Sequence, residues 1–91
     1  MNEFLNMLIN LVYKILPLKE EQNPYLNDYL DSLIIQLKGA LDTYPYLKTN
    51  TQYISIINTV QYFYNNDFTV KQCKREVFKC IKTIKQIKGG V

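Results

Sequence analysis

The sequence predicts an all-α protein, folded as an antiparallel up-down four-helix bundle in a single domain over residues 1–91. Four segments repeat their apolar residues at the three- and four-residue spacing of an amphipathic helix, and no stretch alternates as a half-buried strand does. The connections between these segments are short, so consecutive helices are expected to be antiparallel neighbours. The predicted helices span about 3–16, 24–42, 50–65 and 70–88.

The first predicted helix, 3–16, has an unusually wide apolar face. Its apolar and aromatic residues run from Phe4 to Leu16, so we expect neighbouring helices to cover it on most sides. Pro17 is expected to end this helix, because proline lacks an amide donor and clashes with the preceding turn. One narrow stripe is polar and consists of Glu3, Asn6, Asn10 and Lys14.

The second predicted helix, 24–42, begins at an Asn-Pro pair, with Asn23 as its N-cap and Pro24 at the first helical position. Gly39 lies inside it at a cost of about 1 kcal/mol relative to alanine, which indicates a close approach of another helix there. Tyr44-Pro45 ends the pattern. The expected core stripe comprises Leu26, Tyr29, Leu30, Leu33, Ile34, Leu37 and Leu41.

The third predicted helix, 50–65, follows a capping-box pattern in which Thr49 is the N-cap and Gln52 lies three residues later. Asn65-Asn66-Asp67 is expected to end it, because asparagine tolerates the left-handed conformation of a helix end. Its expected core stripe is Tyr53, Ile56, Ile57, Val60 and Tyr64.

The fourth predicted helix, 70–88, starts at a second capping box, Thr69 to Gln72, and ends before Gly89-Gly90. Phe68 precedes the cap and is placed to pack onto Cys73 as a hydrophobic staple. The expected core stripe is Val70, Cys73, Val77, Cys80, Ile84 and Ile87.

Composition argues against catalysis. Histidine is absent, which removes the commonest general base and metal ligand, and the chain has no glycine-rich phosphate loop. The carboxylate pairs Asp28 with Asp31 and Glu20 with Glu21 could act in acid–base chemistry if buried, but they lie in stretches expected to be solvated. We therefore predict no catalytic residues, no metal site and no cofactor, and we expect a protein that is not an enzyme.

The two cysteines and the apolar N-terminal segment indicate a cytoplasmic protein. Cys73 and Cys80 are separated by roughly 10 Å of helical rise, too far for a disulfide within one helix, and two thiols cannot complete a zinc site. They are expected to be buried core residues in a reducing compartment. Residues 4–16 are too short to span a bilayer and lack the basic flank of a secretion signal.

The charge of the chain is concentrated in its last helix. Residues 71–88 hold seven cations and one anion, although the whole chain has a net charge of only +3. On a helical wheel most of these cations share one arc opposite the apolar stripe, and Phe78 points into its middle. Tyr62 points away from the core stripe of the preceding helix. The simplest interpretation is a solvated face, and the alternative is a partner-binding surface formed by Tyr62, Lys71, Lys74, Arg75, Phe78, Lys79, Lys82 and Lys85.

Nucleic acid and membrane are the other partners that a basic helix admits. A small phage- or plasmid-type DNA-binding regulator could use this helix, but its cations are mostly lysines, which read guanine less well than arginine does. No short helix-turn-helix with a glycine turn is evident. A peripheral contact with anionic lipid needs only the charge and no insertion.

Residues 53–87 resemble the bacteriocin immunity proteins of Gram-positive bacteria, the pediocin-like group that includes the enterocin A immunity protein. The resemblance lies in an Ile/Val-rich helix from Tyr53 that ends in the aromatic run Tyr62-Phe63-Tyr64, a polar turn to Phe68-Thr69 and a closing amphipathic helix. Residues 23–42 fit the preceding helix less specifically. The chain departs from the family outline in its very apolar first helix and in the short segment after its last helix.

The resemblance implies a non-enzymatic cytoplasmic protein that protects the cell against a pore-forming antimicrobial peptide. In this family the peptide engages a membrane receptor, typically the mannose phosphotransferase permease, and the immunity protein recognises the blocked receptor complex from the cytoplasmic face of the membrane. Specificity is attributed to the C-terminal half, which here contains Tyr62, Phe78 and the basic arc.

Overall fold

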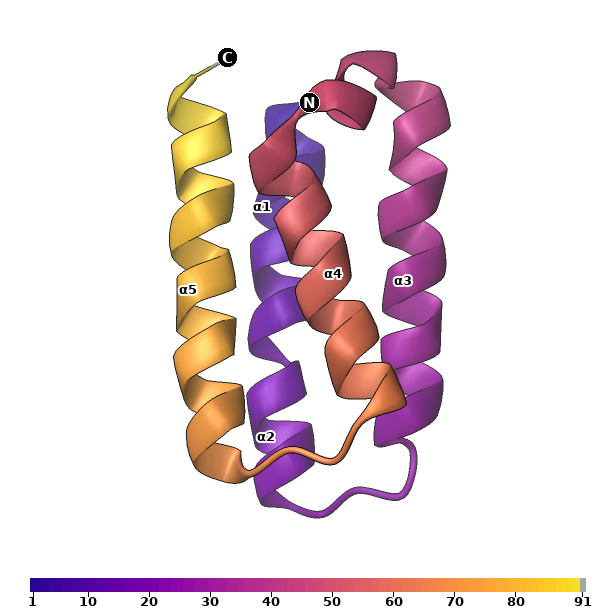
Figure 1. The fold of residues 1–91 in the computed structure, drawn as a ribbon. Coiled ribbons are helices and arrows are strands. Elements are labelled where there is room, and N and C mark those ends of the chain that lie inside the picture. The colour runs from indigo at the N-terminus through magenta and orange to yellow at the C-terminus, as the bar shows by residue number, and fades with distance from the viewer. Residues whose placement is uncertain (91) are drawn as a thin grey trace.

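The computed structural model describes residues 1–90, and this part of the chain consists of helices and their connections, without strands. The predicted all-α fold class is therefore confirmed. Two successive pieces make up the first helical rod, so the fold has four rods (Figure 1). The elements are α1 (Asn2–Tyr13), α2 (Ile15–Glu20), α3 (Leu26–Thr43), the 3₁₀ helix η1 (Pro45–Thr49), α4 (Thr51–Asn65) and α5 (Val70–Gly89).

The last helix, α5, packs against α1, α2 and α4, whereas α3 packs against α4 and α2. Figure 1 shows the N-terminus, η1 and the end of α5 together at one end of the molecule. The α2–α3 and α4–α5 connections lie at the other end. α5 and α3 consequently form opposite sides of the bundle, with α1 and α4 between them (Figure 1).

Pro17 does not end the first helix, which corrects the prediction. The helix is interrupted earlier, at Lys14, and α2 begins at Ile15 and continues to Glu20. Pro17 therefore lies in the first turn of α2, where backbone amides have no partner within their own helix. Its missing amide donor costs little at that position.

The connection between α2 and α3 is shorter than predicted. Gln22 has a φ of 53°, and its amide returns to the Lys19 carbonyl at 3.1 Å, in the manner of a Schellman helix end. The Asn23 side chain then accepts a hydrogen bond from the Tyr25 amide at 2.9 Å. Asn23 thus caps a turn rather than the helix itself, since α3 begins only at Leu26.

The N-cap of α4 is Asn50 and not Thr49, a second correction. Asn50 accepts a hydrogen bond from the Tyr53 amide through its side-chain oxygen at 2.9 Å. Thr49 is the last residue of η1, and its hydroxyl donates to the Tyr46 carbonyl at 3.2 Å. Asparagine caps a helix as well as threonine does, so the 3₁₀ turn decides which of the two adjacent residues is used.

The α4–α5 connection confirms one predicted cap and corrects another. Asn66 ends α4 in an extended conformation, with φ −137° and ψ 155°, rather than in the left-handed one. The predicted capping box of α5 is complete, because Thr69 accepts from the Gln72 amide at 3.0 Å and Gln72 accepts from the Thr69 amide at 2.9 Å. Phe68 is buried beside this box, with its ring centroid 4.4 Å from that of Phe63.

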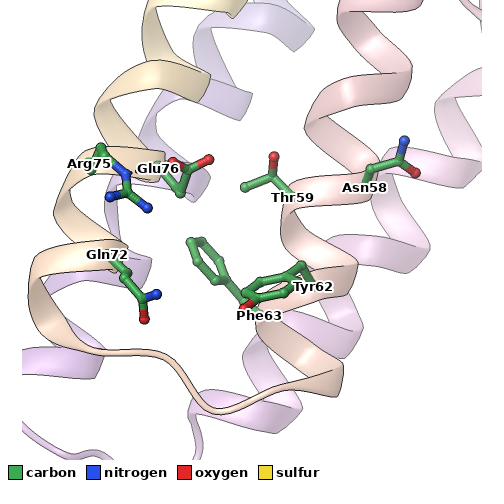
Figure 2. Close-up of a pocket in the computed structure, with 7 residues that line it drawn as sticks. All are labelled: Asn58, Thr59, Tyr62, Phe63, Gln72, Arg75 and Glu76. Atoms are coloured by element: carbon green, nitrogen blue, oxygen red, sulfur yellow. Dashed lines mark hydrogen bonds and ion pairs between the residues drawn. The ribbon is translucent and has the colours of Figure 1, made fainter.

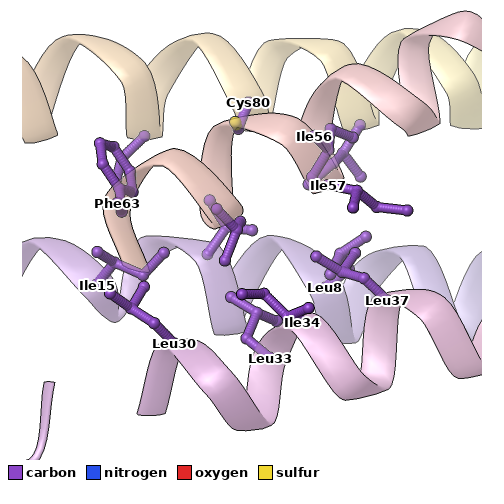
Figure 3. Packing of buried hydrophobic residues seen from close by; sticks show 14 of the residues in the cluster. Leu8, Ile15, Leu30, Leu33, Ile34, Leu37, Ile56, Ile57, Phe63 and Cys80 are labelled. Carbon is purple, nitrogen blue, oxygen red and sulfur yellow. The ribbon is translucent and has the colours of Figure 1, made fainter. Parts of the chain in front are cut away.

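One continuous apolar core joins all four rods (Figure 3). Two tyrosines tie the helices together with hydrogen bonds across this core. The buried Tyr53 hydroxyl of α4 donates to the Leu37 carbonyl of α3 at 2.6 Å, and the Tyr29 hydroxyl of α3 donates to the Leu11 carbonyl of α1. Of the predicted stripes, the residues that are buried are Leu30, Leu33, Ile34, Leu37, Tyr53, Ile56, Ile57, Val60, Cys73, Val77, Cys80, Ile84 and Ile87.

Several predicted core residues are exposed instead. On α4 the structure buries Phe63 and leaves Tyr64 outside, which places the ring without a hydroxyl in the core. Val70, the first residue of α5, borders an open hollow beside the α2–α3 connection. On α1, Met7 is exposed, so the bundle does not cover the wide apolar face as fully as expected.

Gly39 is not a point of close helix contact. A methyl group added there would meet no atom within 4 Å, because this position of α3 faces open space. The predicted packing role is therefore wrong. Gly39 therefore only lowers the helix propensity at an exposed position in the interior of α3.

Gly39→Ala is expected to stabilise the protein by about 0.5–1 kcal/mol, because alanine has the higher helix propensity and finds free space here. Urea unfolding followed by circular dichroism measures the change. A lower unfolding midpoint in the variant would contradict this account of the site.

Tyr53→Phe is expected to destabilise the protein by about 1–2 kcal/mol, because it removes the buried hydrogen bond to the Leu37 carbonyl and little else. The control is Tyr64→Phe, on the same helix, whose side chain is exposed. The control should unfold at the urea concentration of the unaltered protein. Equal effects of the two substitutions would show that the buried hydrogen bond contributes nothing.

Candidate functional site

The outer face of α5 carries the predicted cations. The apolar stripe of this helix points into the bundle, which leaves the opposite arc in solvent. We call this arc the basic face of α5, and its six members, all exposed, are Lys71, Lys74, Arg75, Lys79, Lys82 and Lys85. Lys88 lies apart from it, half-buried, where its ammonium group contacts the Asn6 side-chain oxygen of α1.

Carboxylates neutralise little of this charge. Within residues 1–90 the one ion pair joins the Arg75 Nε to the Glu76 Oε2 at 3.0 Å. No carboxylate in that range lies within ion-pairing distance of the five lysines of the basic face. The charge of α5 therefore projects into solvent, where it attracts anionic partners at a distance.

The charges on the rest of the bundle are distributed unevenly. The neighbouring helix α4 has no charged residue at all. α3, on the far side of the bundle, carries Asp28, Asp31 and Asp42 against a single cation, Lys38. The molecule thus has one basic side, one mildly acidic side and a neutral wall between them (Figure 1).

Phe78 is exposed in the basic face, with 46% of its surface accessible. Its ring lies 6.3 Å from that of Tyr13 on α1, in an edge-on arrangement at 61°. Tyr13 is itself 50% exposed, although the sequence placed it on the covered face of the first helix. The two rings form a small apolar step on the boundary between α1 and α5, and sequence reasoning missed the Tyr13 half because only the packing of the two helices brings it there.

Tyr62 belongs to α4, which packs against the flank of α5 opposite to Phe78. It is half exposed and borders a hollow of about 350 Å³ between α4 and α5 (Figure 2). The structure therefore does not bring the two predicted aromatic contacts together. The α4 wall of the hollow consists of Asn58, Thr59, Tyr62 and Phe63, and the α5 wall consists of Gln72, Arg75 and Glu76.

Both cysteines are buried free thiols on the inner stripe of α5. Burial raises the pKa of each thiol to about 11, because the thiolate loses its hydration in the core. At neutral pH these thiols are protonated and poor nucleophiles. They serve as packing residues in the core, on the inner stripe of α5.

The candidate carboxylate pairs lie on the surface of the bundle. Asp28, Asp31, Glu20 and Glu21 are all exposed. Residues 1–90 contain no group of three or more acidic, cysteine or histidine side chains arranged to hold a metal ion. In the same range, no helix has both the length and the apolarity needed to cross a membrane.

The chain matches no protein-family model, and no curated protein and no solved structure is significantly similar to it. The likeness to bacteriocin immunity proteins consequently stays a prediction from the sequence pattern.

The stability of the protein is expected to fall as the pH rises from about 9 to about 11. A thiol in the unfolded chain titrates near 9.0, whereas both folded-state values are about 11, so the unfolded state loses its protons first. Burial also raises the pKa values of Tyr29 and Tyr53, which extends the loss above pH 10. Urea unfolding across this range measures the trend.

The control is the double variant Cys73→Ala/Cys80→Ala. Its unfolding midpoint should change less between pH 9 and 10 than that of the unaltered protein, whatever its absolute stability. Parallel pH profiles for the two proteins would assign the loss to other groups.

Proposed function

We propose that this protein is a bacteriocin immunity protein, a non-enzymatic cytoplasmic binder that protects a Gram-positive cell against a pore-forming antimicrobial peptide. The proposal includes an antiparallel up-down four-helix bundle, supported by the placement of the connections at alternating ends (Figure 1). Its partner would be the complex of peptide and membrane receptor, of which the mannose phosphotransferase permease is the expected receptor, reached from the inner face of the membrane.

The observation that carries the proposal is an exposed aromatic step at the edge of a basic face in which only Arg75 is paired with a carboxylate within residues 1–90. Cations around the step draw the protein towards the anionic inner leaflet, at about 1 kcal/mol per basic residue near the surface. Contact through Phe78 and Tyr13 then supplies the short-range apolar anchor that charge alone cannot provide. Long-range attraction and local recognition thus reside on one helix face.

Phe78→Ala is expected to reduce protection at least tenfold, measured as the peptide concentration that inhibits growth of a sensitive Gram-positive strain expressing the chain. Truncation of an aromatic hot-spot residue costs about 2 kcal/mol or more of binding free energy, and a tenfold change needs about 1.4 kcal/mol. The matched control, Ile35→Ala on α3, removes a side chain that is 63% exposed on the opposite side of the bundle and should leave protection unchanged.

Circular dichroism of both variants establishes that the fold persists. Full protection by a folded Phe78→Ala variant would remove this residue from the contact. If the unaltered protein is folded in the cell and protects against none of a panel of pediocin-like peptides, the proposed function fails.

The alternative is a small DNA-binding regulator that uses the basic face of α5. It is supported by the same row of exposed cations and predicts binding to a DNA duplex that weakens steeply with salt, in proportion to the phosphates neutralised. Salt-sensitive DNA binding together with absent protection would favour this alternative.

A further inference from the structure

We infer that the hollow between α4 and α5 binds a peptide segment of the partner in which an apolar side chain lies next to a carboxylate. This inference rests on the proposed function, because it names the chemistry of the segment that the immunity protein would recognise. It concerns the side of α5 that faces Tyr62 of α4 and not the aromatic step around Phe78.

The hollow offers an apolar seat of limited size. Its volume of about 350 Å³ lies at the lower end of the range of ligand sites, which suits one or two side chains. Tyr62 and Phe63 present their rings to it from α4, and Thr59 adds its methyl group (Figure 2). Because α4 carries no charge, an apolar side chain entering from this wall desolvates no charged group of that helix.

The opposite wall offers a positioned guanidinium. Arg75 is 66% exposed and is held through its Nε by the Glu76 carboxylate at 3.0 Å. Its two terminal nitrogens have no hydrogen-bond partner within residues 1–90, so the planar fork remains available for a bidentate contact with a carboxylate. Two lysines on the same face add positive charge, Lys71 one turn before Arg75 and Lys79 one turn after it.

The charge pattern favours a peptide over a polyanion. Glu76 also lines the hollow, and its charge repels a chain of closely spaced phosphates more strongly than it repels one or two carboxylates. The α4 wall has no cation to bind a second phosphate, so a nucleic acid or a lipid surface would be matched on one wall only. A segment with one apolar anchor and one or two carboxylates complements both walls.

The test is a titration of the full ¹⁵N-labelled protein, followed through its amide resonances, with the acetylated and amidated peptide Ser-Asp-Leu-Phe-Glu-Ser. We expect saturable shifts at Thr59, Tyr62 and Arg75. A peptide with Ser-Ser in place of Leu-Phe, and one with Gln and Asn in place of the acids, should each bind at least fivefold more weakly. Equal binding of either peptide would overturn the inference.

The matched charge controls are Arg75→Gln and Lys85→Gln, which each remove one positive charge from the same helix face. Lys85 lies ten residues further along α5, about 15 Å from Arg75 along the helix axis. Arg75→Gln should weaken binding about tenfold, as expected for the loss of a charge-assisted contact, and Lys85→Gln less than twofold. Equal weakening would show general electrostatic attraction and overturn the site.

Anionic phosphatidylglycerol vesicles and a DNA duplex are titrated in parallel. If either shifts the amides of the hollow while the peptide does not, the inference is overturned. Protection of cells without peptide binding would reject this site and leave the proposed function standing, whereas peptide binding without protection would reject the proposed function alone.

Discussion

Burial of the narrow apolar stripe of α5 is the constraint on which the rest of the structure depends. This helix is poorly suited to exist alone, since cations one turn apart, such as Lys71 and Arg75, repel each other by a few tenths of a kcal/mol. Each buried Val or Ile on the inner stripe returns about 1.5–3 kcal/mol, so packing outweighs repulsion by a wide margin. Because α1, α2 and α4 all meet this stripe, the basic face has no other direction in which to point.

Regular periodicity made most of the fold predictable from sequence. The helix pattern of α3, α4 and α5 locates their buried residues, since one face of each helix must meet the core. The N-cap of a helix was predictable only where the sequence offers a single capping residue. Thr69 has no capping residue next to it, and its box is confirmed, whereas Thr49 and Asn50 are adjacent and both able to cap, and the preceding 3₁₀ helix takes up Thr49. The prediction that Pro17 ends the first helix was wrong for a similar reason. The energetic cost of Pro17 depends on whether the helix is interrupted at Lys14, and no local sequence signal marks that interruption.

The candidate surfaces were predictable in part. A helical wheel suffices to place the cations of α5 and Phe78 in solvent, because it requires only the direction of the core. The ring of Tyr13 beside Phe78 and the hollow beside Tyr62 depend on how separate helices pack, which a wheel does not contain. Phe78 and Tyr62 looked equivalent in the sequence but consequently lie on different flanks of α5. Phe78 lies where α5 meets α1, and Tyr62 lies where α4 meets α5.

The contact between Tyr13 and Phe78 joins the first helical rod of the chain to the last. Contacts between residues so far apart in sequence require the ordering of a long loop before they can form. A nascent chain on the ribosome that lacks α5 cannot form the aromatic step. A chain in which α5 has detached from the bundle cannot form it either. The aromatic step is therefore a feature of the finished molecule only, so under the proposed function an unfinished or damaged copy would lack this contact surface.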